Sequence, residues 1–393
     1  MKISLKAIIF ATLAIVASSC NAPTERTEVI GTMPEAENGY SLGVSACYAA
    51  TNNGCLLLAG GCNFPDTPAA EGGKKRYYKG IYLTTGNSTL QWKKVGELPE
   101  TSAYGVSLQY GNNLIIAGGM NEKSPSQAVN MLSCEGENIT IKQLPPLPCT
   151  IDNAAGAVSG NNIYIAGGNA NGKASSRLFT LNINDQQTGW QELVPFPGSG
   201  RVQPVCAATD EALYLWGGFT PKDSLTEAKV HTDGYKYTFA DKKWSALDTV
   251  TDENGAQLTL SGGTAIAYND TLILAAGGVN RTIFEDAISG TYNCIPQKEY
   301  MKQAAEWYKF NGRLLAFDTK REQWHLVQKN QLYARAGALL TTDGEYIYYI
   351  GGELKPGIRT PEIVKSNIIP NKYETPLKFR EETPSSGIIF PED

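Results

Sequence analysis

The chain has little of several residue types on which common functional sites depend. Only two of its 393 residues are histidine, so a histidine-rich metal site is not expected. No CxxC motif is present, which argues against a zinc site and against dithiol redox chemistry. The 34 lysine and arginine residues are outnumbered by 39 acidic ones and form no extended basic cluster. We therefore expect no metal, no other cofactor and no nucleic-acid partner.

Long hydrophobic runs are also scarce. The apolar run at 7–17 follows a basic N-terminus and is too short to cross a bilayer. This pattern predicts a signal peptide over 1–19. The sequence Ala-Ser-Ser-Cys at 17–20 resembles a bacterial lipobox, with Cys20 as the lipidated residue and 20–27 as a polar tether. We expect a protein of the periplasm or cell envelope that touches a membrane only through its lipid anchor.

Seven cysteines remain beyond Cys20, which is an odd number for a compartment that permits disulfides. Cys134 ends one expected strand and Cys149 follows the next, so these two cysteines could pair. The alternative is that most of the seven are buried free thiols that act as small core residues. We favour this alternative.

Glycine, in contrast, is abundant, with 40 residues, and part of it forms a repeat. Six times a short apolar strand runs into a glycine pair, at 56–61, 114–119, 163–168, 213–218, 272–278 and 347–352. A repeat near fifty residues with this signature is typical of kelch motifs. It predicts an all-β fold, a six-bladed kelch-type β-propeller over 28–375, followed by a polar tail over 376–393.

The sixth repeat lacks a convincing outer strand of its own. The segment 28–34 reads like 94–99, which is the expected outer strand of the first repeat. We therefore expect the N-terminal strand to close the last blade, because this pairing would remove two exposed sheet edges.

Loops of two kinds should meet on one face of the propeller, because neighbouring strands alternate in direction. Three of the loops that follow glycine pairs are long: 62–78, 279–313 and 353–360. The second has helical spacing at 300–308. The loops that precede the inner strands bring candidate binding residues to the same mouth, where loops on a rigid frame usually carry function. These residues are Tyr40, Tyr104, Asn153, Arg201 and Arg335.

One loop carries residues that could perform acid–base chemistry. Glu353 directly follows the last glycine pair, in the sequence Gly-Glu-Leu-Lys-Pro-Gly-Ile-Arg-Thr. The Pro356-Gly357 dipeptide favours a turn, which would fold Arg359 back toward Glu353. One interpretation is a salt bridge that only staples the turn. The other is a carboxylate base beside a guanidinium that binds an anion.

This segment resembles the active-site motif of the bacterial N-acetylneuraminate epimerases, or sialic acid mutarotases, which are secreted six-bladed kelch propellers. The resemblance covers nearly the whole expected propeller, but the blades come in shifted order, as in a cyclically permuted branch. A closed ring tolerates such a permutation. Further matching stretches are 103–108, 196–198 with Arg201 and Gln203, 277–280 with 283–284, and 300–310 with 314–318.

The resemblance implies that Glu353 accepts a proton and that Arg359 is its partner in the site. Such an enzyme interconverts the α and β anomers of N-acetylneuraminate by opening and reclosing the sugar ring, without a cofactor. A base takes the proton of the anomeric hydroxyl while an acid protonates the ring oxygen. A guanidinium can hold the substrate carboxylate through two parallel hydrogen bonds. Tyr104, Tyr40 or a water molecule are the candidates for the acid.

The chain departs from the family at one position, where Ser102 stands in place of an arginine. Arg201 or Arg335 could substitute for it in binding substrate, or each could be an ordinary surface charge. Gln203 and Asn280 are further candidates for substrate binding, although Asn280 could simply cap a turn. The sequence leaves a homodimer open.

Other functions fit the sequence less well. A non-catalytic glycan- or protein-binding propeller would keep the aromatic mouth but would not need Glu353. A sialidase would carry Ser-x-Asp-x-Gly-x-x-Trp turns, and the sequence has none. A copper oxidase needs two histidine ligands, whereas His231 and His325 lie in outer-strand stretches of different repeats. The sequence therefore favours a mutarotase, with the binding propeller as the alternative.

Overall fold

The computed structural model describes residues 26–85, 90–368 and 377 of the chain. The expected signal peptide, the lipidation site Cys20, and nearly all of the tether and of the polar tail lie outside the described residues. Among the helices that are described, none combines the length and the hydrophobicity needed to cross a membrane.

Six antiparallel sheets, each with four main strands, contain most of the strands in the described chain. From the inner to the outer strand, the first three are β2 (Tyr48–Asn52), β3 (Cys55–Ala59), β6 (Gly80–Thr85) and β7 (Gln91–Glu97); β8 (Val106–Tyr110), β9 (Asn113–Ala117), β10 (Val129–Glu135) and β11 (Asn138–Leu144); and β13 (Ala155–Ser159), β14 (Asn162–Ala166), β17 (Leu178–Asn182) and β18 (Gln191–Leu193). The other three are β19 (Val202–Ala208), β20 (Ala212–Thr220), β22 (Gly234–Thr238) and β23 (Lys243–Leu247), with the short β21 (Lys229–Val230) added to β20; β24 (Thr264–Asn269), β25 (Leu272–Ala276), β26 (Arg313–Asp318) and β27 (Gln323–Lys329); and β28 (Leu339–Thr342), β29 (Tyr346–Ile350), β32 (Glu362–Asn367) and β1 (Thr27–Thr32).

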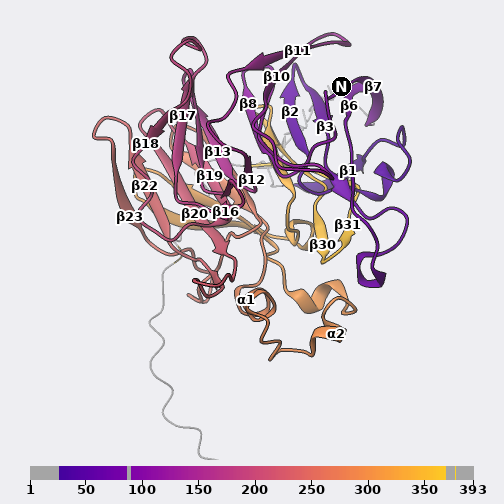
Figure 1. Cartoon of the computed structure of the whole chain (residues 1–393), viewed down its shortest axis with the longest axis vertical. Helices are drawn as coiled ribbons and strands as arrows, with labels where there is room; N and C mark the ends of the chain where they lie inside the picture. The colour runs from indigo at the N-terminus through magenta and orange to yellow at the C-terminus, as the bar shows by residue number, and fades with distance from the viewer. Residues whose placement is uncertain (1–25, 86–89, 369–376, 378–393) are drawn as a thin grey trace, which may run out of the picture.

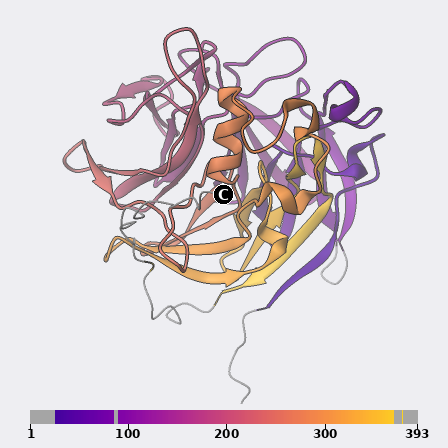
Figure 2. The ribbon, with the colours of Figure 1, turned by 90° about the horizontal axis from the view of Figure 1, so that it is seen from below.

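The inner strands of the six sheets contact one another in a closed circuit. The order is β2, β8, β13, β19, β24, β28 and back to β2. The hydrophobic core follows the same circuit, because each large cluster is shared by two neighbouring sheets. Leu57 and Leu114 belong to the cluster between the first and second sheets, and Leu58 and Ile350 to the one between the first and last. The described chain is therefore all-β, with its core distributed around a ring of small sheets (Figure 2).

A ring of backbone hydrogen bonds runs around the axis where the inner strands begin. Each of six residues donates its N–H to the carbonyl of its counterpart in the neighbouring sheet, over 2.7–3.2 Å. All six have positive φ angles, between 51° and 70°. Four of them are not glycine, so a conformation that L-residues seldom adopt is imposed at the same place in successive repeats. We call these residues the mouth ring: Ala46, Tyr104, Asn153, Gln203, Gly262 and Gly337.

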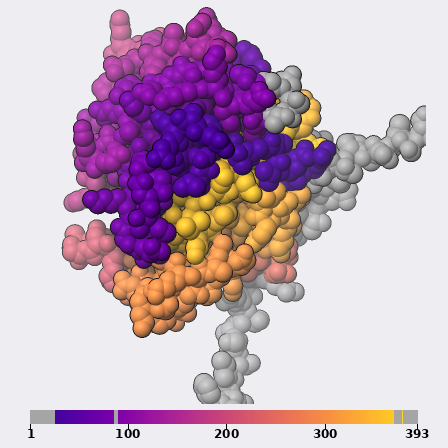
Figure 3. Space-filling model, turned by 90° about the vertical axis from the view of Figure 1, so that its right-hand side faces the viewer, coloured from indigo at the N-terminus to yellow at the C-terminus, as the bar shows by residue number. Residues whose placement is uncertain are grey.

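The N-terminal strand closes the last sheet, as the sequence predicted. β1 pairs antiparallel with β32, from Thr27 opposite Ser366 to Thr32 opposite Glu362. The Thr27 hydroxyl lies 2.8 Å from that of Ser366, which ties the two strands together through their side chains as well. In Figure 3 the N-terminal part of the chain, in indigo, lies directly against the yellow C-terminal part. The first and last parts of the described chain thus complete one sheet.

The loops meet on one face in the way that strand alternation predicted. A residue three positions before an inner strand bridges to the residue after a glycine pair, as Ser45 does with Cys62 and Ala336 with Glu353. Short extra strands form there: β4 (Cys62–Asn63) with β5 (Arg76–Tyr77), β12 (Ile151–Asp152) with β15 (Asn169–Ala170) and β16 (Lys173–Ala174), and β30 (Glu353–Lys355) with β31 (Ile358–Arg359). Both α-helices lie on this side of the molecule, next to β30 and β31 (Figure 1).

The helical part of the insertion 279–313 differs from the prediction. The main helix is α1 (Arg281–Ser289), and the expected helix at 300–308 is only the end of α2 (Gln297–Tyr300) followed by a 3-10 turn, Ala305–Tyr308. Asn280 explains the start of α1, because its side chain accepts a hydrogen bond from the N–H of Ile283. The other 3-10 turns are Tyr40–Leu42, Ala69–Glu71 and Gln331–Tyr333.

The seven described cysteines are all free thiols. Five are buried, Cys55 is half-buried and Cys294 is exposed. Cys134 and Cys149, which could have formed a disulfide, are among the buried free thiols. The interpretation of most cysteines as small core residues is therefore confirmed.

Candidate active site

The β30–β31 hairpin places Glu353 and Arg359 side by side. The two residues are cross-strand partners, and Nη1 of Arg359 lies 2.7 Å from Oε1 of Glu353. The turn between them depends on Gly357, which has a φ of 84° and donates its N–H to the same carboxylate oxygen over 2.8 Å. The turn predicted from Pro356-Gly357 therefore forms and brings the two side chains into an ion pair.

The two members of this pair differ in their access to solvent. The Arg359 side chain is 4% exposed, and its Nε donates to the Ser45 hydroxyl over 3.1 Å. Its guanidinium also lies 5.0 Å from the centre of the Phe64 ring. The Glu353 side chain is 24% exposed. The arginine is thus anchored in the protein, whereas the carboxylate keeps a face that an incoming molecule can reach.

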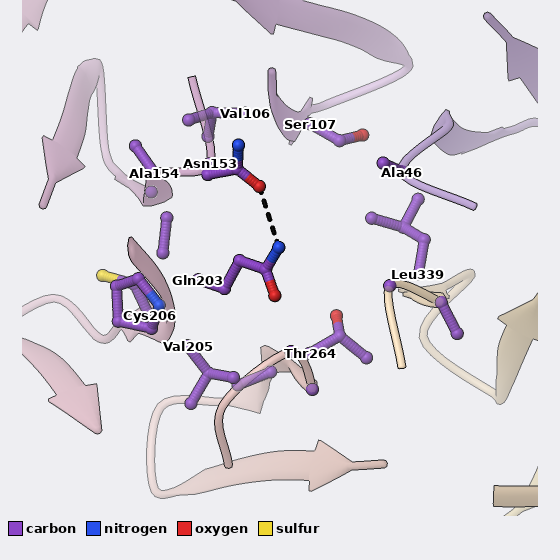
Figure 4. Close-up of a pocket in the computed structure, with 18 of the residues that line it drawn as sticks. Ala46, Val106, Ser107, Asn153, Ala154, Gln203, Val205, Cys206, Thr264 and Leu339 are labelled. Atoms are coloured by element: carbon purple, nitrogen blue, oxygen red, sulfur yellow. Dashed lines mark hydrogen bonds between the residues drawn. The ribbon is translucent and has the colours of Figure 1, made fainter. Parts of the chain in front are cut away.

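A cavity of about 170 Å³ opens where the inner strands of the six sheets begin. All six residues of the mouth ring line it, together with the first residues of the inner strands. Figure 4 looks into this cavity and shows Gln203 reaching toward Asn153, with Nε2 of the glutamine donating to Oδ1 of the asparagine over 2.9 Å. The backbones of Glu353 and Ala336 exchange two hydrogen bonds, each N–H donating to the carbonyl of the other residue, and Ala336 directly precedes Gly337 of the mouth ring. The backbone of the hairpin therefore adjoins the mouth ring, although neither Glu353 nor Arg359 is among the residues that line the cavity.

Tyr104 connects the cavity to the ion pair. It belongs to the mouth ring and lines the cavity. Burial raises the pKa of its phenol well above the ordinary value, and the nearby Arg359 charge opposes this effect. The hydroxyl accepts a hydrogen bond from Nζ of Lys75 over 2.8 Å. A protonated phenol beside an ammonium group therefore shares the mouth with the carboxylate of Glu353.

The insertion 279–313 packs against the hairpin from the other side. Nζ of Lys355 donates to the carbonyl of Gln303 over 2.6 Å. Tyr308 donates its hydroxyl to the carbonyl of Tyr300. Burial, with a smaller contribution from the Glu353 charge, raises the pKa of Tyr308 to about 12. The insertion thus gives the hairpin an aromatic support of protonated tyrosines.

Three residues predicted to bind substrate do not line the cavity and have partners within the protein. Arg201 is fully buried and pairs with Asp233 over 2.6 Å, and Arg335 is 1% exposed and pairs with Glu362 over 2.7 Å. Tyr40 is also fully buried. All three donate to the carbonyl of the first glycine in the pair of their own repeat, at Gly217, Gly351 and Gly60. They hold the glycine turns in place.

Of the remaining residues predicted to bind substrate, two line the cavity and one has a structural role. Gln203 and Tyr104 line the cavity as expected, whereas the Asn280 side chain caps α1, the alternative that the sequence left open. Lys75 was missed, although it lies in the long loop 62–78 that was expected at the mouth. A basic residue in a loop has no spacing signal, so only the fold reveals its partner.

Comparison with known proteins agrees with these features. A family model described as N-acetylneuraminate epimerase matches residues 14–141 and 144–378. Similar proteins include the N-acetylneuraminate epimerase of Salmonella enteritidis PT4 (strain P125109), 29% identical over 251 residues, which are 62% of this chain and 63% of that protein. The N-acetylneuraminate epimerase of Haemophilus influenzae (strain PittEE) is 31% identical over 226 residues, 56% of this chain and 57% of that protein. The aligned part thus spans less than two thirds of either relative, but the family model covers most of the chain. The chain belongs to the N-acetylneuraminate epimerase family.

Proposed function

We propose that this protein is a sialic acid mutarotase, an isomerase that interconverts the α and β anomers of N-acetylneuraminate. We further propose that its ring of six sheets is a six-bladed kelch-type β-propeller whose last blade is closed by the N-terminal strand. The inner-strand circuit and the mouth ring support this description of the fold. Family membership supports the reaction class.

The Glu353–Arg359 pair, on a hairpin whose backbone adjoins the mouth ring, is the observation that carries the proposal. A binding protein needs no partly exposed carboxylate beside an anchored guanidinium, whereas ring opening needs a base at the anomeric hydroxyl. Glu353 takes this proton, and the buried Arg359 holds the carboxylate group of Glu353 in place through their ion pair. The amides of Gln203 and Asn153 offer hydrogen bonds to the hydroxyl and acetamido groups of a sugar.

The proposed reaction opens the ring and closes it again on the other face. Removal of the anomeric proton and protonation of the ring oxygen break the bond between the anomeric carbon and that oxygen. The open-chain ketone then turns its other face to the hydroxyl formed from the ring oxygen. This hydroxyl attacks the ketone carbon, and the two protons return to the acid and to the anomeric oxygen. No net proton is gained or lost, so acid and base alone complete the cycle.

We also propose that the protein acts in the periplasm or at the cell envelope, held by a lipid on Cys20. The apolar run and the lipobox-like sequence support this location. A Cys20→Ala variant should then appear in the soluble fraction of the envelope rather than with membranes. Recovery of both proteins in the same fraction would contradict the anchor.

The function is tested by following the relaxation of freshly released α-N-acetylneuraminate by NMR. Purified protein at micromolar concentration should speed the approach to the equilibrium mixture of anomers. A folded protein that leaves the spontaneous rate unchanged would overturn the proposal. If that protein still binds the sugar, the non-catalytic glycan-binding propeller becomes the better description.

A further inference from the structure

The acid of the proposed reaction is the part that the carboxylate and the arginine leave unassigned. Of the three candidates named from the sequence, Tyr40 is fully buried and donates to the carbonyl of Gly60, so it cannot reach a substrate. Tyr104, in contrast, lines the cavity and stands near Glu353 and Arg359. Its backbone is fixed within the mouth ring by hydrogen bonds to Ala46 and Asn153.

Lys75 distinguishes Tyr104 from the other tyrosines of the mouth. Its Nζ lies 2.8 Å from the Tyr104 hydroxyl and 4.7 Å from the centre of the same ring. The distance of 4.7 Å shows that the ammonium lies close to the Tyr104 ring as well as to its hydroxyl. Nζ is also 5.9 Å from the centre of the Phe64 ring, against which the Arg359 guanidinium packs. Two cations thus lie within about 6 Å of one phenyl ring, and one of them, Lys75, also bonds to the Tyr104 phenol.

We propose that Tyr104 is the acid that protonates the ring oxygen of the sugar, and that Lys75 is a positioning residue that stabilises the phenolate left behind. This inference rests on the proposed function, which it completes by naming the second proton carrier. The Lys75 ammonium has only donors, so its bond to the phenol oxygen strengthens as that oxygen becomes negative.

The electrostatics explain why the lysine is needed. Burial raises the pKa of Tyr104. The phenol therefore stays protonated, but giving its proton to the substrate costs more free energy. A proton donor works best when its pKa is close to the operating pH. The charges of Lys75 and Arg359 favour the phenolate and reduce this difficulty.

The proton balance closes with these two carriers. In the opening step Glu353 takes the proton of the anomeric hydroxyl, the bond between anomeric carbon and ring oxygen breaks, and Tyr104 gives its proton to that oxygen. In the closing step the hydroxyl formed from the ring oxygen attacks the other face of the ketone and returns its proton to the phenolate. The protonated Glu353 then gives its proton to the ketone oxygen, and both side chains regain their starting states.

Substitutions at the two positions test this assignment in the full-length protein. Tyr104→Phe should lower kcat by about a hundred- to ten-thousandfold, and Lys75→Met by about ten- to a hundredfold with little change in KM. Lys75→Arg should recover most of the lost kcat. Lys74→Met, at the exposed neighbouring lysine, is the matched control and should behave as the wild type.

The double variant separates action through Tyr104 from independent binding. If Lys75 acts on the phenol, adding Lys75→Met to Tyr104→Phe lowers kcat no further. The role of Lys75 would be overturned if Lys75→Met changed only KM, or if the kcat losses of the two single variants multiplied in the double variant. Lys75 would then be a residue that binds the carboxylate of the substrate. Full activity of a folded Tyr104→Phe protein would overturn the acid. Because the wild type and Glu353→Gln are measured alongside, failure of the mutarotase function itself would be recognised separately by an inactive wild type.

Discussion

Replacing Glu353 by glutamine separates the catalytic role of the ion pair from its structural role. Glutamine keeps the size of the side chain and an oxygen that can accept the bond from Gly357, which is 2.8 Å away in the native protein. It removes the charge that takes the proton. We expect kcat to fall by about a hundred- to ten-thousandfold, which corresponds to about 3–5 kcal/mol of transition-state stabilisation.

The same substitution should also lower the free energy of unfolding. The Arg359 side chain, 4% exposed, would keep its bond to Ser45 but lose its counter-charge. A hydrogen bond to a charged group contributes about 1.5–3 kcal/mol. Because Glu353 is 24% exposed and water can reach the pair, we expect a loss near the lower end, about 1–2 kcal/mol.

A second substitution then distinguishes the two effects. Removing both partners of an ion pair is far less harmful than removing one, because no buried charge remains unpaired. The double variant Glu353→Gln, Arg359→Met should therefore regain most of the stability in a denaturant titration while staying inactive in the NMR assay. Recovery of activity together with stability would show that the pair only staples the turn, and would refute its assignment as the catalytic pair.

Three further predictions concern the frame. Asp233→Asn leaves the fully buried Arg201 unpaired and should destabilise the protein by about 2–4 kcal/mol, more than Arg201→Met, because the remaining Asp233 is 41% exposed; equal losses in urea titrations would contradict this reasoning. Gly351→Ala should destabilise more than Gly344→Ala, since both positions have positive φ but a Cβ at the first would lie 2.5 Å from the backbone carbonyl oxygen of Val44 whereas the second faces open space; equal melting temperatures would show that the backbone moves to admit the methyl group. Ion pairs with an arginine and a lysine lower the pKa of Glu253 from 4.5 to about 2, so its contribution is present above pH 4.5 and is lost as the pH falls toward 2. Glu253→Gln should therefore flatten the decline of melting temperature over this range, and an unchanged slope would exclude Glu253 as a source of the pH dependence.

Local sequence was enough to predict much of the fold and one essential contact. The apolar strands with their glycine pairs became the second strand of each sheet, and the similarity of 28–34 to 94–99 foretold the pairing of β1 with β32. The contact between Glu353 and Arg359 was predictable because only a short turn separates them. In each case the signal lies within a few residues or repeats along the chain.

Contacts between distant loops gave no such signal. Lys75 and Tyr104 are 29 positions apart and come from neighbouring repeats, so their approach depends on how the ring closes. The insertion was misjudged for a related reason. Its aromatic residues at 300–308 have helical spacing, but they pack on one another and on the β30–β31 hairpin in a short turn. Tertiary packing thus replaced the local preference.

The misassigned arginines point to a rule for reading repeated folds. Arg201 donates to the carbonyl of Gly217 and Arg335 to that of Gly351, and both bonds span 16 positions along the chain. The same offset in two repeats indicates a need that these repeats share, which here is a donor to the carbonyl of the first glycine of the pair. Residues that perform chemistry on one ligand have no reason to recur in this way. Short hairpins follow the glycine pairs of several repeats, but the Glu353–Arg359 ion pair and the contact of Lys75 with Tyr104 each occur in one repeat. Departure from the repeat, rather than charge at the mouth, therefore separates the candidate site from the frame.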